Sequence, residues 1–371
     1  MNLAITCIAW VESIVKNEIE RLWYNITETR DRIIFVEWTD DAIARINLWS
    51  RVGNKVYVEI AKWKVKDFDD LFDLFLSCNI KDYINDWNQI FIDAVSDKSQ
   101  LNSIPAIQRV ATKAIISGIT WSKDKLYTPL RNAPKSELLV FIQDNICRLL
   151  LNTSWEALHK RWYRDTTHEA PIKESLAAAL VILSWWDYKS PLYDLFCWSG
   201  TILVEAALLA KNIAPWSLWR RFAFEAFDWY DKKYLINAKT EAESKIFNKW
   251  IYKIIWSDIS EDNIALSSQS AKNAKVSDII SLSVKDVRDY IWNEKLLGYL
   301  VSNPPYWLRL WDMTLPFIYK DIAKILITNP ELRWWIITSF EQFDTMIDQR
   351  KFKKRKLYNW NEKCYFYKKL N

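Results

Sequence analysis

The sequence predicts an α/β protein with a doubly wound, Rossmann-like parallel sheet, preceded by smaller α+β modules. Three observations lead to this prediction. From residue 172 onward, short apolar runs alternate with segments of helical periodicity, as parallel strands joined by helices do. Two of these runs end in an acidic residue, Asp194 and Asp258, where such sheets bind their ligands. The final run, KLYNWNEKCYFYKK, consists of two strand-like halves about a short turn and predicts an antiparallel hairpin on the sheet edge.

Length and composition fit a globular protein of two or three domains. The 371 residues are 50% hydrophobic and 26% charged, and the net charge of +5 permits an anionic partner without demanding one. Five scattered cysteines and two histidines give no reason to expect a disulfide framework or a metal site. No apolar run reaches the roughly 18 residues of a membrane span, and the N-terminus lacks the pattern of a signal peptide. We therefore expect a cytoplasmic protein.

The N-terminal part predicts two α+β modules and a linker. Residues 1–60 place two helical segments, ESIVKNEIERL and DDAIARINLWS, between strand-like runs. Residues 61–158 add an amphipathic helix, a strand, a second helix and further strand signals. Residues 159–171 are polar and basic and contain a proline, as expected of a linker. Cations in a linker are more often solvated than bound, but those of this segment are candidates for phosphate contacts: Lys160, Arg161 and Arg164.

The remaining residues, 172–371, supply the strands and helices of the predicted sheet. Helical periodicity marks IKESLAAALVILS, TILVEAALLAKNI and EDNIALSSQSAKNA. The strand-like runs are PLYDLFC, YKIIWSDI, DIISLSV, KLLGYLVSNPPY and RWWIITSF. Because the carboxyl ends of parallel strands meet at one edge, the residues that follow these runs are the candidates for a binding site.

Three strand ends carry polar residues that suit a nucleotide. The stretch 194–201, DLFCWSGT, reads as strand, tight loop and helix, which is how a doubly wound sheet presents its nucleotide-binding turn. Asp258 ends the next strand, where its carboxylate could accept hydrogen bonds from a ribose diol. Asp286 follows the third strand and could meet an adenine amine.

The loop Asn303-Pro304-Pro305-Tyr306 ends a fourth strand and gives the sharpest signal. Two prolines fix the backbone, so the loop is stiff. The side-chain oxygen of Asn303 and the carbonyl of Pro304 can accept both hydrogens of a flat exocyclic amine, while Tyr306 offers a face for stacking. Catalysis in such a site would consist mainly of positioning the amine against an electrophilic methyl group. The alternative is a rigid surface turn without function.

These motifs resemble a known family. NPPY, DLFCWSGT and IIWSDIS, with APIKESLAAAL before them, look like class I S-adenosylmethionine-dependent methyltransferases that act on exocyclic amines. HKRWYRDTTHEAPIKESLAAALVIL and the two N-terminal modules resemble, more narrowly, the THUMP-domain RNA guanine-N2 methyltransferases. That resemblance implies a ferredoxin-like module at 1–60, an RNA-binding THUMP domain at 61–158 and a methyltransferase domain at 172–371. It also implies a cofactor site made of Asp194, Cys197, Trp198, Ser199, Gly200, Thr201, Asp258, Ile259 and Asp286.

The resemblance leaves the substrate open. It implies an RNA guanine, with 23S ribosomal RNA first and tRNA as the alternative, but NPPY loops also serve DNA adenine or cytosine and protein glutamine. A non-catalytic RNA-binding protein with a degenerate methyltransferase domain is the alternative outside enzymes. Leu195 stands where relatives have proline, which leaves the loop entry less rigid. The run 350–356 adds candidates for phosphate contacts beside the hairpin, namely Lys353, Lys354 and Arg355, although a solvated loop is equally compatible with this run.

Tryptophan and glycine usage is anomalous. The chain has 23 tryptophans and 4 glycines, whereas glycine averages about 7% of residues. Trp198 stands in a loop that needs glycine, and family motifs place glycine at the positions of three more: Trp162, Trp256 and Trp307. Trp23 follows a helix and Trp360 sits at the hairpin tip, both positions that favour glycine. We hypothesise that UGA codons written here as tryptophan are read as glycine in the source organism, with Trp186 and Trp229 as genuine tryptophans. The alternative, a Trp-rich surface for stacking nucleic acids, predicts clustering on one face.

Overall fold

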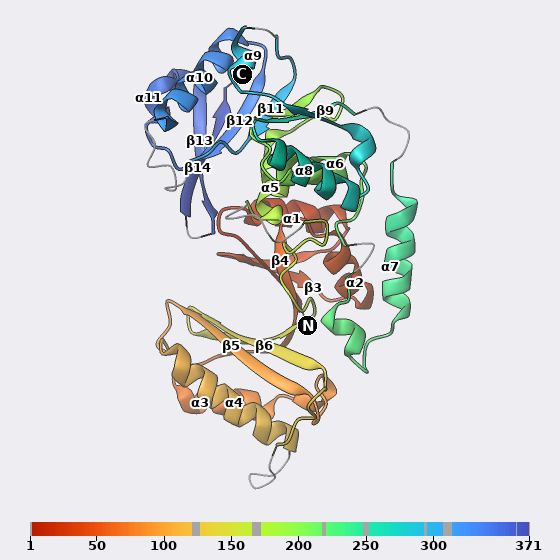
Figure 1. Cartoon of the computed structure of the whole chain (residues 1–371). Coiled ribbons are helices and arrows are strands. Elements are labelled where there is room, and N and C mark those ends of the chain that lie inside the picture. The colour runs from red at the N-terminus through yellow and green to blue at the C-terminus, as the bar shows by residue number, and fades with distance from the viewer. Residues whose placement is uncertain are drawn as a thin grey trace. The chain divides into compact units, whose positions relative to one another are not determined.

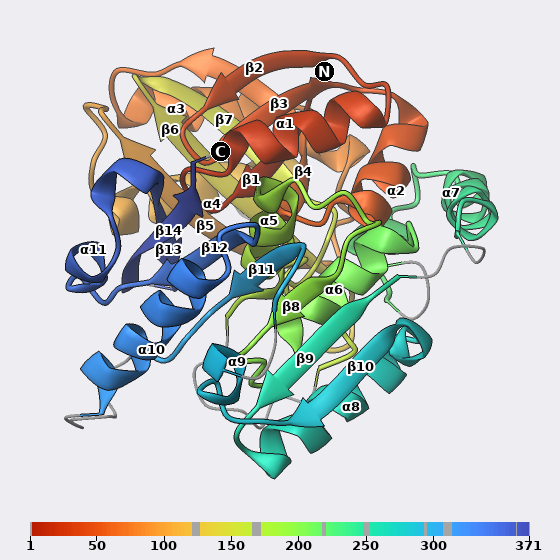
Figure 2. The same ribbon diagram turned by 90° about the horizontal axis from the view of Figure 1, so that it is seen from above.

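The computed structural model describes residues 2–120, 127–164, 172–216, 220–247, 252–292, 295–306, 314–360 and 362–370. These residues form two compact units. The first contains residues 1–7, 16–158 and 220–240, and the second contains residues 8–15, 159–219 and 241–371. Each unit is built on one seven-stranded sheet (Figures 1 and 2). The two mixed sheets with helices confirm the predicted α/β class.

The sheet of the first unit has the strand order β2-β3-β1-β4-β7-β6-β5. Its strands are β1 (Asn2–Cys7), β2 (Ile26–Arg30), β3 (Ile33–Glu37), β4 (Gly53–Lys64), β5 (Gln89–Asp97), β6 (Lys135–Gln143) and β7 (Ile146–Asn152). Its helices are α1 (Glu12–Arg21), which crosses the boundary between the units, α2 (Asp40–Trp49), α3 (Phe68–Ser77) and α4 (Ile104–Thr120), with a 3₁₀ turn η1 (Ile80–Asp82).

β4 joins the two predicted N-terminal modules into one sheet. The strand is long enough to pair antiparallel with β1 near its start and with β7 over most of its length. Beyond it, α3 begins at the N-cap Asp67, whose carboxylate accepts hydrogen bonds from the backbone of Asp69 and Asp70. α3 and α4 pack together against the β5–β6 part of the sheet (Figure 1). Residues 220–240, with η2 (Ala223–Ala226) and most of α7 (Lys233–Ser244), also belong to this unit.

The sheet of the second unit has the order β10-β9-β8-β11-β12-β14-β13. Its parallel strands are β8 (Leu192–Asp194), β9 (Ile254–Asp258), β10 (Ile280–Val284), β11 (Tyr299–Ser302) and β12 (Arg333–Thr338). β13 (Phe352–Asn359) and β14 (Glu362–Lys369) form the predicted antiparallel hairpin at the edge. The strand order reverses between β8 and β11, which makes their carboxyl ends the topological switch point.

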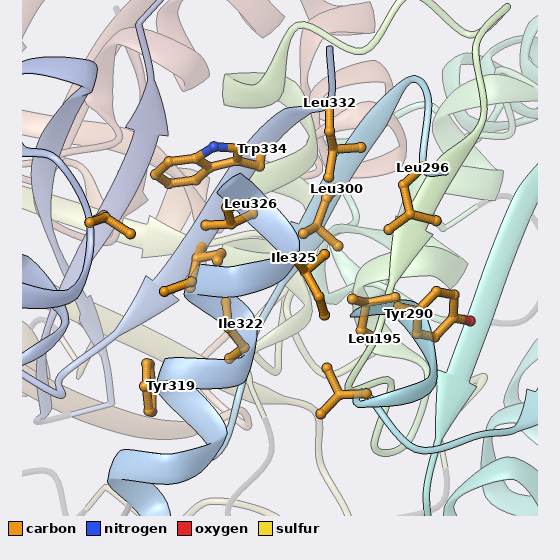
Figure 3. Close-up of a cluster of buried hydrophobic side chains, with 14 of the residues drawn as sticks. Leu195, Tyr290, Leu296, Leu300, Tyr319, Ile322, Ile325, Leu326, Leu332 and Trp334 are labelled. Atoms are coloured by element: carbon orange, nitrogen blue, oxygen red, sulfur yellow. The ribbon is translucent and has the colours of Figure 1, made fainter. Parts of the chain in front are cut away.

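Helices alternate with these strands. They are α5 (Glu174–Ser184), α6 (Thr201–Ala210), α8 (Glu261–Asn273), α9 (Asp289–Trp292), α10 (Leu315–Thr328) and α11 (Phe343–Met346), with 3₁₀ turns η3 (Ser277–Ile279) and η4 (Gln349–Lys351). α10 lays its apolar side chains, among them Ile322 and Ile325, on one sheet face against Leu300 of β11 (Figure 3). Burial of this kind stabilises a fold by about 25 cal/mol per Å² of apolar surface, and here it holds the NPPY-bearing strand in place.

Within the described ranges, no helix is long and apolar enough to cross a membrane. The same residues contain no group of three or more histidine, cysteine or acidic side chains that could hold a metal ion.

Candidate active site

The switch point between β8 and β11 is bridged by side chains. Asp194 ends β8 and is 2% exposed. Ser302, the last residue of β11, donates a hydrogen bond of 2.5 Å to Asp194 Oδ1, and the backbone N–H of Phe196 donates to the same oxygen. Burial in this apolar surrounding raises the pKa of Asp194 from 3.8 to about 8, against the opposing effect of these hydrogen bonds.

The loop after β8 is a tight turn that leads into α6. The N–H of Gly200 donates to the carbonyl of Cys197, and Gly200 has φ +78°. A Cβ atom at this position would lie 2.5 Å from the Trp256 ring, so only glycine fits here. Cys197 is buried, which raises the pKa of its thiol, and its Sγ lies 3.5 Å from Ser267 Oγ.

Two further residues line the same turn without requiring a positive φ. Ser199 and Thr201 are buried at the start of α6, with their hydroxyl oxygens 3.3 Å apart. The first turn of α6 supplies free backbone N–H groups, as helix N-termini do. The loop is thus a tight turn that leads into the start of α6, with Trp198 inside it.

Trp198 adopts φ 50°, in the left-handed region that glycine favours. Its indole Nε1 donates a hydrogen bond of 2.9 Å to the carbonyl of Asn303, so the side chain reaches from the loop of β8 to the NPPY loop. Its backbone is held by the carboxylate of Asp258, which accepts from the Trp198 N–H at 3.0 Å. The indole therefore occupies the space between the two loops that a nucleotide cofactor would enter.

Asp258 organises the loop edge from the end of β9. Besides the Trp198 N–H, its carboxylate accepts hydrogen bonds of 3.0 Å from the Ser260 N–H and the Asn263 amide. A carboxylate offers about four acceptor positions, so Asp258 retains capacity for a further donor. The next residue, Ile259, is 67% exposed, an unusual position for an apolar side chain at a strand end.

Asp286 lies beyond the end of β10, the strand beside β9. The backbone N–H and guanidinium of Arg288 donate to its carboxylate, and these hydrogen bonds lower the pKa of Asp286. The strands pair so that Val284 lies opposite Asp258. The two predicted acidic residues therefore belong to neighbouring strand ends.

The NPPY loop presents an unused acceptor. Asn303 Oδ1 is buried and has no hydrogen-bond partner among the described residues. Tyr306 turns its hydroxyl toward the hairpin, where the Asn359 amide donates to it at 3.1 Å. Burial raises the pKa of Tyr306 strongly, so its hydroxyl stays protonated at physiological pH. Trp307 lies outside the described residues.

Comparison with known families identifies the chain. A family model described as an RMKL-like methyltransferase domain matches residues 161–368, which is more than half of the chain. This chain belongs to the RMKL-like methyltransferase family. A second model, described as the RlmL ferredoxin-like domain, matches residues 2–57. The methyltransferase assignment and the ferredoxin-like N-terminal module are thus confirmed.

Individual relatives agree with this family. The chain is 32% identical, over 99% of its length and 95% of the relative's, to a Bacillus subtilis (strain 168) protein named "Putative RNA methyltransferase YpsC". It is 27% identical to the ribosomal RNA large subunit methyltransferase K/L of Marinomonas sp. (strain MWYL1), covering 98% of this chain and 52% of that longer protein.

Two solved structures share the fold over the whole chain. One is described as a "predicted N6-adenine-specific DNA methylase" from Listeria monocytogenes str. 4b F2365, with a TM-score of 0.90, 33% identity, and coverage of 100% of this chain and 96% of the other. The second, SMU.472, is described as a "putative methyltransferase complexed with SAH", with a TM-score of 0.88, 28% identity, and coverage of 100% and 98%.

The predicted RNA contacts of the methyltransferase around residue 160 divide by burial. Lys160 is exposed. Arg161 is buried and forms an ion pair of 3.3 Å with Glu205, whose carboxylate also accepts from the Tyr163 hydroxyl at 2.9 Å. Arg161 therefore stabilises the fold, and the expectation that it faces a phosphate is wrong because its guanidinium does not reach the surface. Arg164 is half-buried and pairs with Glu174 at 3.2 Å.

The second predicted group lies on β13, where neighbouring side chains point to opposite faces. Lys353 and Lys354 are both exposed, and Lys354 pairs with Asp344 of α11. The guanidinium of Arg355 donates to the backbone carbonyl of Trp10. The three cations therefore do not form one patch.

Sequence reasoning missed two residues that shape the site. Ser302 immediately precedes the NPPY motif, so its position at the strand end was a usable signal. Asn359 is 53 residues from Tyr306 in the chain, and nothing in its local pattern pointed to that residue. Only the pairing of the hairpin with the sheet brings it there.

Proposed function

We propose that this methyltransferase transfers the methyl group of S-adenosylmethionine to the exocyclic N2 amine of a guanine in RNA. The buried Oδ1 of Asn303, which has no partner among the described residues, carries the proposal. A buried acceptor without a donor costs free energy, so such an atom at a ligand site calls for a donor from the ligand. The amine of a nucleobase supplies that donor.

The NPPY loop would act by positioning. Asn303 Oδ1 and the carbonyl of Pro304 accept the two amine hydrogens, and the stiff Pro304-Pro305 backbone keeps these acceptors in place. Tyr306 offers its ring to the base, because its hydroxyl is already engaged by Asn359. S-adenosylmethionine supplies the electrophilic methyl group when it is bound. Alignment of the amine with that group accounts for the rate, with no need for a strong base.

The loops of β8, β9 and β10 would hold the cofactor. Asp258 keeps an acceptor position for a ribose hydroxyl, and exposed Ile259 offers an apolar surface to the adenine. Asp286 would accept a hydrogen bond from the adenine amine in place of one of the hydrogen bonds that it now accepts from the Arg288 guanidinium. Cys197, Ser199, Gly200 and Thr201 form the turn beside them. These donors and acceptors fit the cofactor, whereas the Trp198 indole fills the cradle between the loops.

RNA as substrate rests on the family and on the names of relatives. Those names specify RNA and large-subunit ribosomal RNA, and we propose 23S ribosomal RNA first and tRNA second. The name of the Listeria structure supports a second candidate, a DNA adenine amine, which an NPPY loop would accept equally well. Methyl transfer from labelled S-adenosylmethionine to ribosomal RNA, tRNA and DNA, followed by nucleoside mass spectrometry, separates the three. Labelled N2-methylguanosine is the expected product; label only in DNA adenine would overturn the proposal.

We also propose the division of labour along the chain. Residues 1–60 form the ferredoxin-like module, 61–158 a THUMP domain that grips RNA, 159–171 a linker and 172–371 the methyltransferase domain. The ferredoxin-like match at 2–57 supports the first boundary. Lys160 and Lys353 are the proposed phosphate contacts that are most exposed, with Arg164, Lys354 and Arg355 available after exchange of their present partners.

We further propose that many tryptophans of the written sequence are glycines in the native protein, because UGA is read as glycine. Tryptophan makes up 23 of 371 residues. Among the described residues, however, it supplies six of the thirteen non-glycine residues with positive φ. These six are Trp10, Trp23, Trp155, Trp185, Trp198 and Trp360. Such backbone favours glycine, because a Cβ atom costs about 1–2 kcal/mol there.

Individual indoles differ in their surroundings, although a hydrogen bond alone does not separate the two classes, since the Trp198 indole is also hydrogen-bonded. Trp186 donates from Nε1 to the Ser190 carbonyl at 2.8 Å, and Trp229 donates to the Tyr83 carbonyl at 3.2 Å, as genuine buried tryptophans do. The Nε1 of Trp256 is buried without a partner among the described residues, and its ring crowds Gly200. Trp185, next to Trp186, is 76% exposed at the left-handed C-cap of α5.

The intact mass of the protein purified from its source organism tests the recoding. A mass lower by about twenty tryptophan-to-glycine differences is expected, a count taken from average glycine usage. A mass equal to that of the written sequence would overturn the recoding and leave an indole in the cofactor cradle. Peptide mapping over residues 192–216 then reports position 198 directly.

A further inference from the structure

The hairpin of β13 and β14 carries an alternation of lysine and tyrosine on one face. Cross-strand pairing places Lys356 opposite Tyr365 and Tyr358 opposite Lys363. Residues directly opposite in an antiparallel pair share a face, and so do residues two apart along a strand. This face of the hairpin carries Tyr367, which lies opposite Lys354 and is buried in the core, and five more accessible side chains that we call the hairpin ladder: Lys354, Lys356, Tyr358, Lys363 and Tyr365.

The cations of the hairpin ladder lie over its rings. Lys354 Nζ is 4.8 Å and Lys363 Nζ is 5.0 Å from the centroid of the Tyr365 ring. Lys356 Nζ is 5.1 Å from the centroid of Tyr358. The ammonium groups therefore lie over the two tyrosine rings, where an incoming base would replace them and leave them to contact the neighbouring phosphates.

The hairpin ladder is accessible and positively charged. Lys354 and Lys363 are exposed, and the other three members are half-buried. Tyr365 also packs partly against the core beneath α11. Lys354 forms an ion pair with Asp344. The ladder has three lysines and no acidic member, so its net charge is positive. β13 is the last strand of the sheet order, and β14 is its neighbour among the described strands.

The ladder ends next to the residue that contacts the NPPY loop. Tyr358 is followed by Asn359, whose amide donates to the hydroxyl of Tyr306. Because neighbouring residues of a strand point to opposite faces, the ladder and this contact lie on opposite faces of the hairpin and come together at its tip. A strand rises about 3.3 Å per residue, so consecutive members of the ladder on one strand are spaced at about twice that distance, close to the spacing of successive nucleotides in an extended chain.

We infer that the hairpin ladder binds an unpaired strand of the RNA substrate, with bases stacked on Tyr358 and Tyr365 and phosphates on the lysines. This inference rests on the proposed function. Aromatic rings interleaved with cations are the combination that binds single strands without regard to sequence, since every base has a face to stack and every phosphate a charge. Duplex RNA hides its base faces and would use the lysines alone. The ladder accordingly selects a flipped or looped target over one within a continuous helix.

Variants of the tyrosines test the inference. Binding of a fluorescently labelled single-stranded RNA of mixed sequence is measured by anisotropy for Tyr358→Ala, Tyr365→Ala and Tyr358→Phe, and repeated with the same RNA annealed to its complement. We expect each alanine variant to bind the single strand about tenfold more weakly, with Tyr358→Phe close to the unchanged protein and duplex affinity little altered. Lys368→Ala is the matched control, because this exposed lysine lies on the opposite face of the same hairpin.

The outcomes separate this inference from the proposed function. Unchanged single-strand affinity in both alanine variants, with circular dichroism showing intact folding, would overturn the ladder as an RNA surface. Equal loss for single strand and duplex would also overturn it, because stacking would then contribute nothing. Failure of the proposed function is recognised independently, since the unchanged protein would then transfer no methyl group to RNA even at saturating RNA.

A salt titration tests the lysines. Substituting Lys356 and Lys363 by alanine together should lower the slope of log affinity against log salt by about 1.4, which is two contacts at about 0.7 each for single strands. The affinity for S-adenosylmethionine should stay constant in the same variant. A slope unchanged from that of the starting protein would show that these ammonium groups do not contact phosphate.

Discussion

The amide of Asn359, at the tip of the C-terminal hairpin, donates a hydrogen bond of 3.1 Å to the hydroxyl of Tyr306 in the NPPY loop. A ring fixed in this way faces a substrate with a defined orientation. The edge hairpin, although distant in sequence from the loop, is therefore part of how the site is built.

Substituting Asn359 by alanine should lower kcat by about fivefold, because a hydrogen bond of this kind contributes about 1 kcal/mol. The affinity for S-adenosylmethionine should not change, since Asn359 contacts the tyrosine and not the cofactor loops. The measurement is methyl-transfer kinetics at saturating cofactor. In a Tyr306→Phe background, which lacks the hydroxyl, the same substitution should have little further effect. Additive losses in the two variants would show that Asn359 acts by another route.

Substituting Trp198 by glycine in a protein made with tryptophan throughout should create or strengthen S-adenosylmethionine binding. The change removes the indole that reaches from the cofactor loop to the Asn303 carbonyl. Stability should change little, because relief of the positive φ, about 1 kcal/mol, offsets the lost hydrogen bond of about 1 kcal/mol. Calorimetric titration of the cofactor against both proteins provides the measurement.

Trp186→Gly is the matched control for that change. Its indole is 4% exposed and donates to the Ser190 carbonyl, so its loss should destabilise the fold by about 3–5 kcal/mol without improving cofactor binding. Denaturant unfolding reports the difference. If both variants behaved alike, tryptophan positions would not divide into the two classes that we propose.

Substituting Arg161 by alanine should destabilise the second unit by about 3–5 kcal/mol, because the buried Glu205 carboxylate would lose its ion-pair partner. Urea unfolding measures this change. Lys160→Ala is the control, since an exposed side chain at the neighbouring position should alter stability by no more than about 0.5 kcal/mol. Loss of RNA binding without loss of stability in Arg161→Ala would restore Arg161 as a phosphate contact.

Glu18 should make the first unit less stable as the pH rises. Its carboxylate lies against Ser50 and the backbone N–H groups of Arg51 and Val52, and burial raises its pKa from 4.5 to about 7. A folded-state pKa above the unfolded value favours the protonated folded form, so this contribution is complete below about 4.5 and is lost as the pH rises through about 7.

Glu18→Gln should flatten the dependence of the unfolding free energy on pH over this window. The raised pKa of Asp194, about 8, also makes the fold less stable as the pH rises. The pH profile of Glu18→Gln is therefore compared with the profiles of Asp194→Asn and of the unchanged protein. A pH profile that is identical with and without Glu18 would show that its carboxylate is not protonated in the fold.

Much of the site could be predicted from sequence because its residues follow strand ends. Asp194, Asp258 and Asn303 each come directly after an apolar run, and parallel strands bring their carboxyl ends together whatever the details of packing. The unusual position of Trp198 could also be predicted, because a tight turn needs a residue with positive φ and this need is a property of the local sequence.

Tertiary structure decided what local pattern cannot express. Arg161 and Lys160 are neighbours of the same chemical type, yet one is buried against Glu205 and the other is exposed, because burial depends on which side of the chain meets α6. Asn359 reaches Tyr306 only because β14 pairs with β12 and brings the hairpin to the sheet edge. The cross-strand register likewise decides which lysines share a face with Tyr358 and Tyr365. The sequence by itself determined the chemistry at the strand ends, because each of these residues directly follows an apolar run that forms a parallel strand. Contacts between distant segments arise from packing the whole sheet, and they alone determined which side chains support that chemistry.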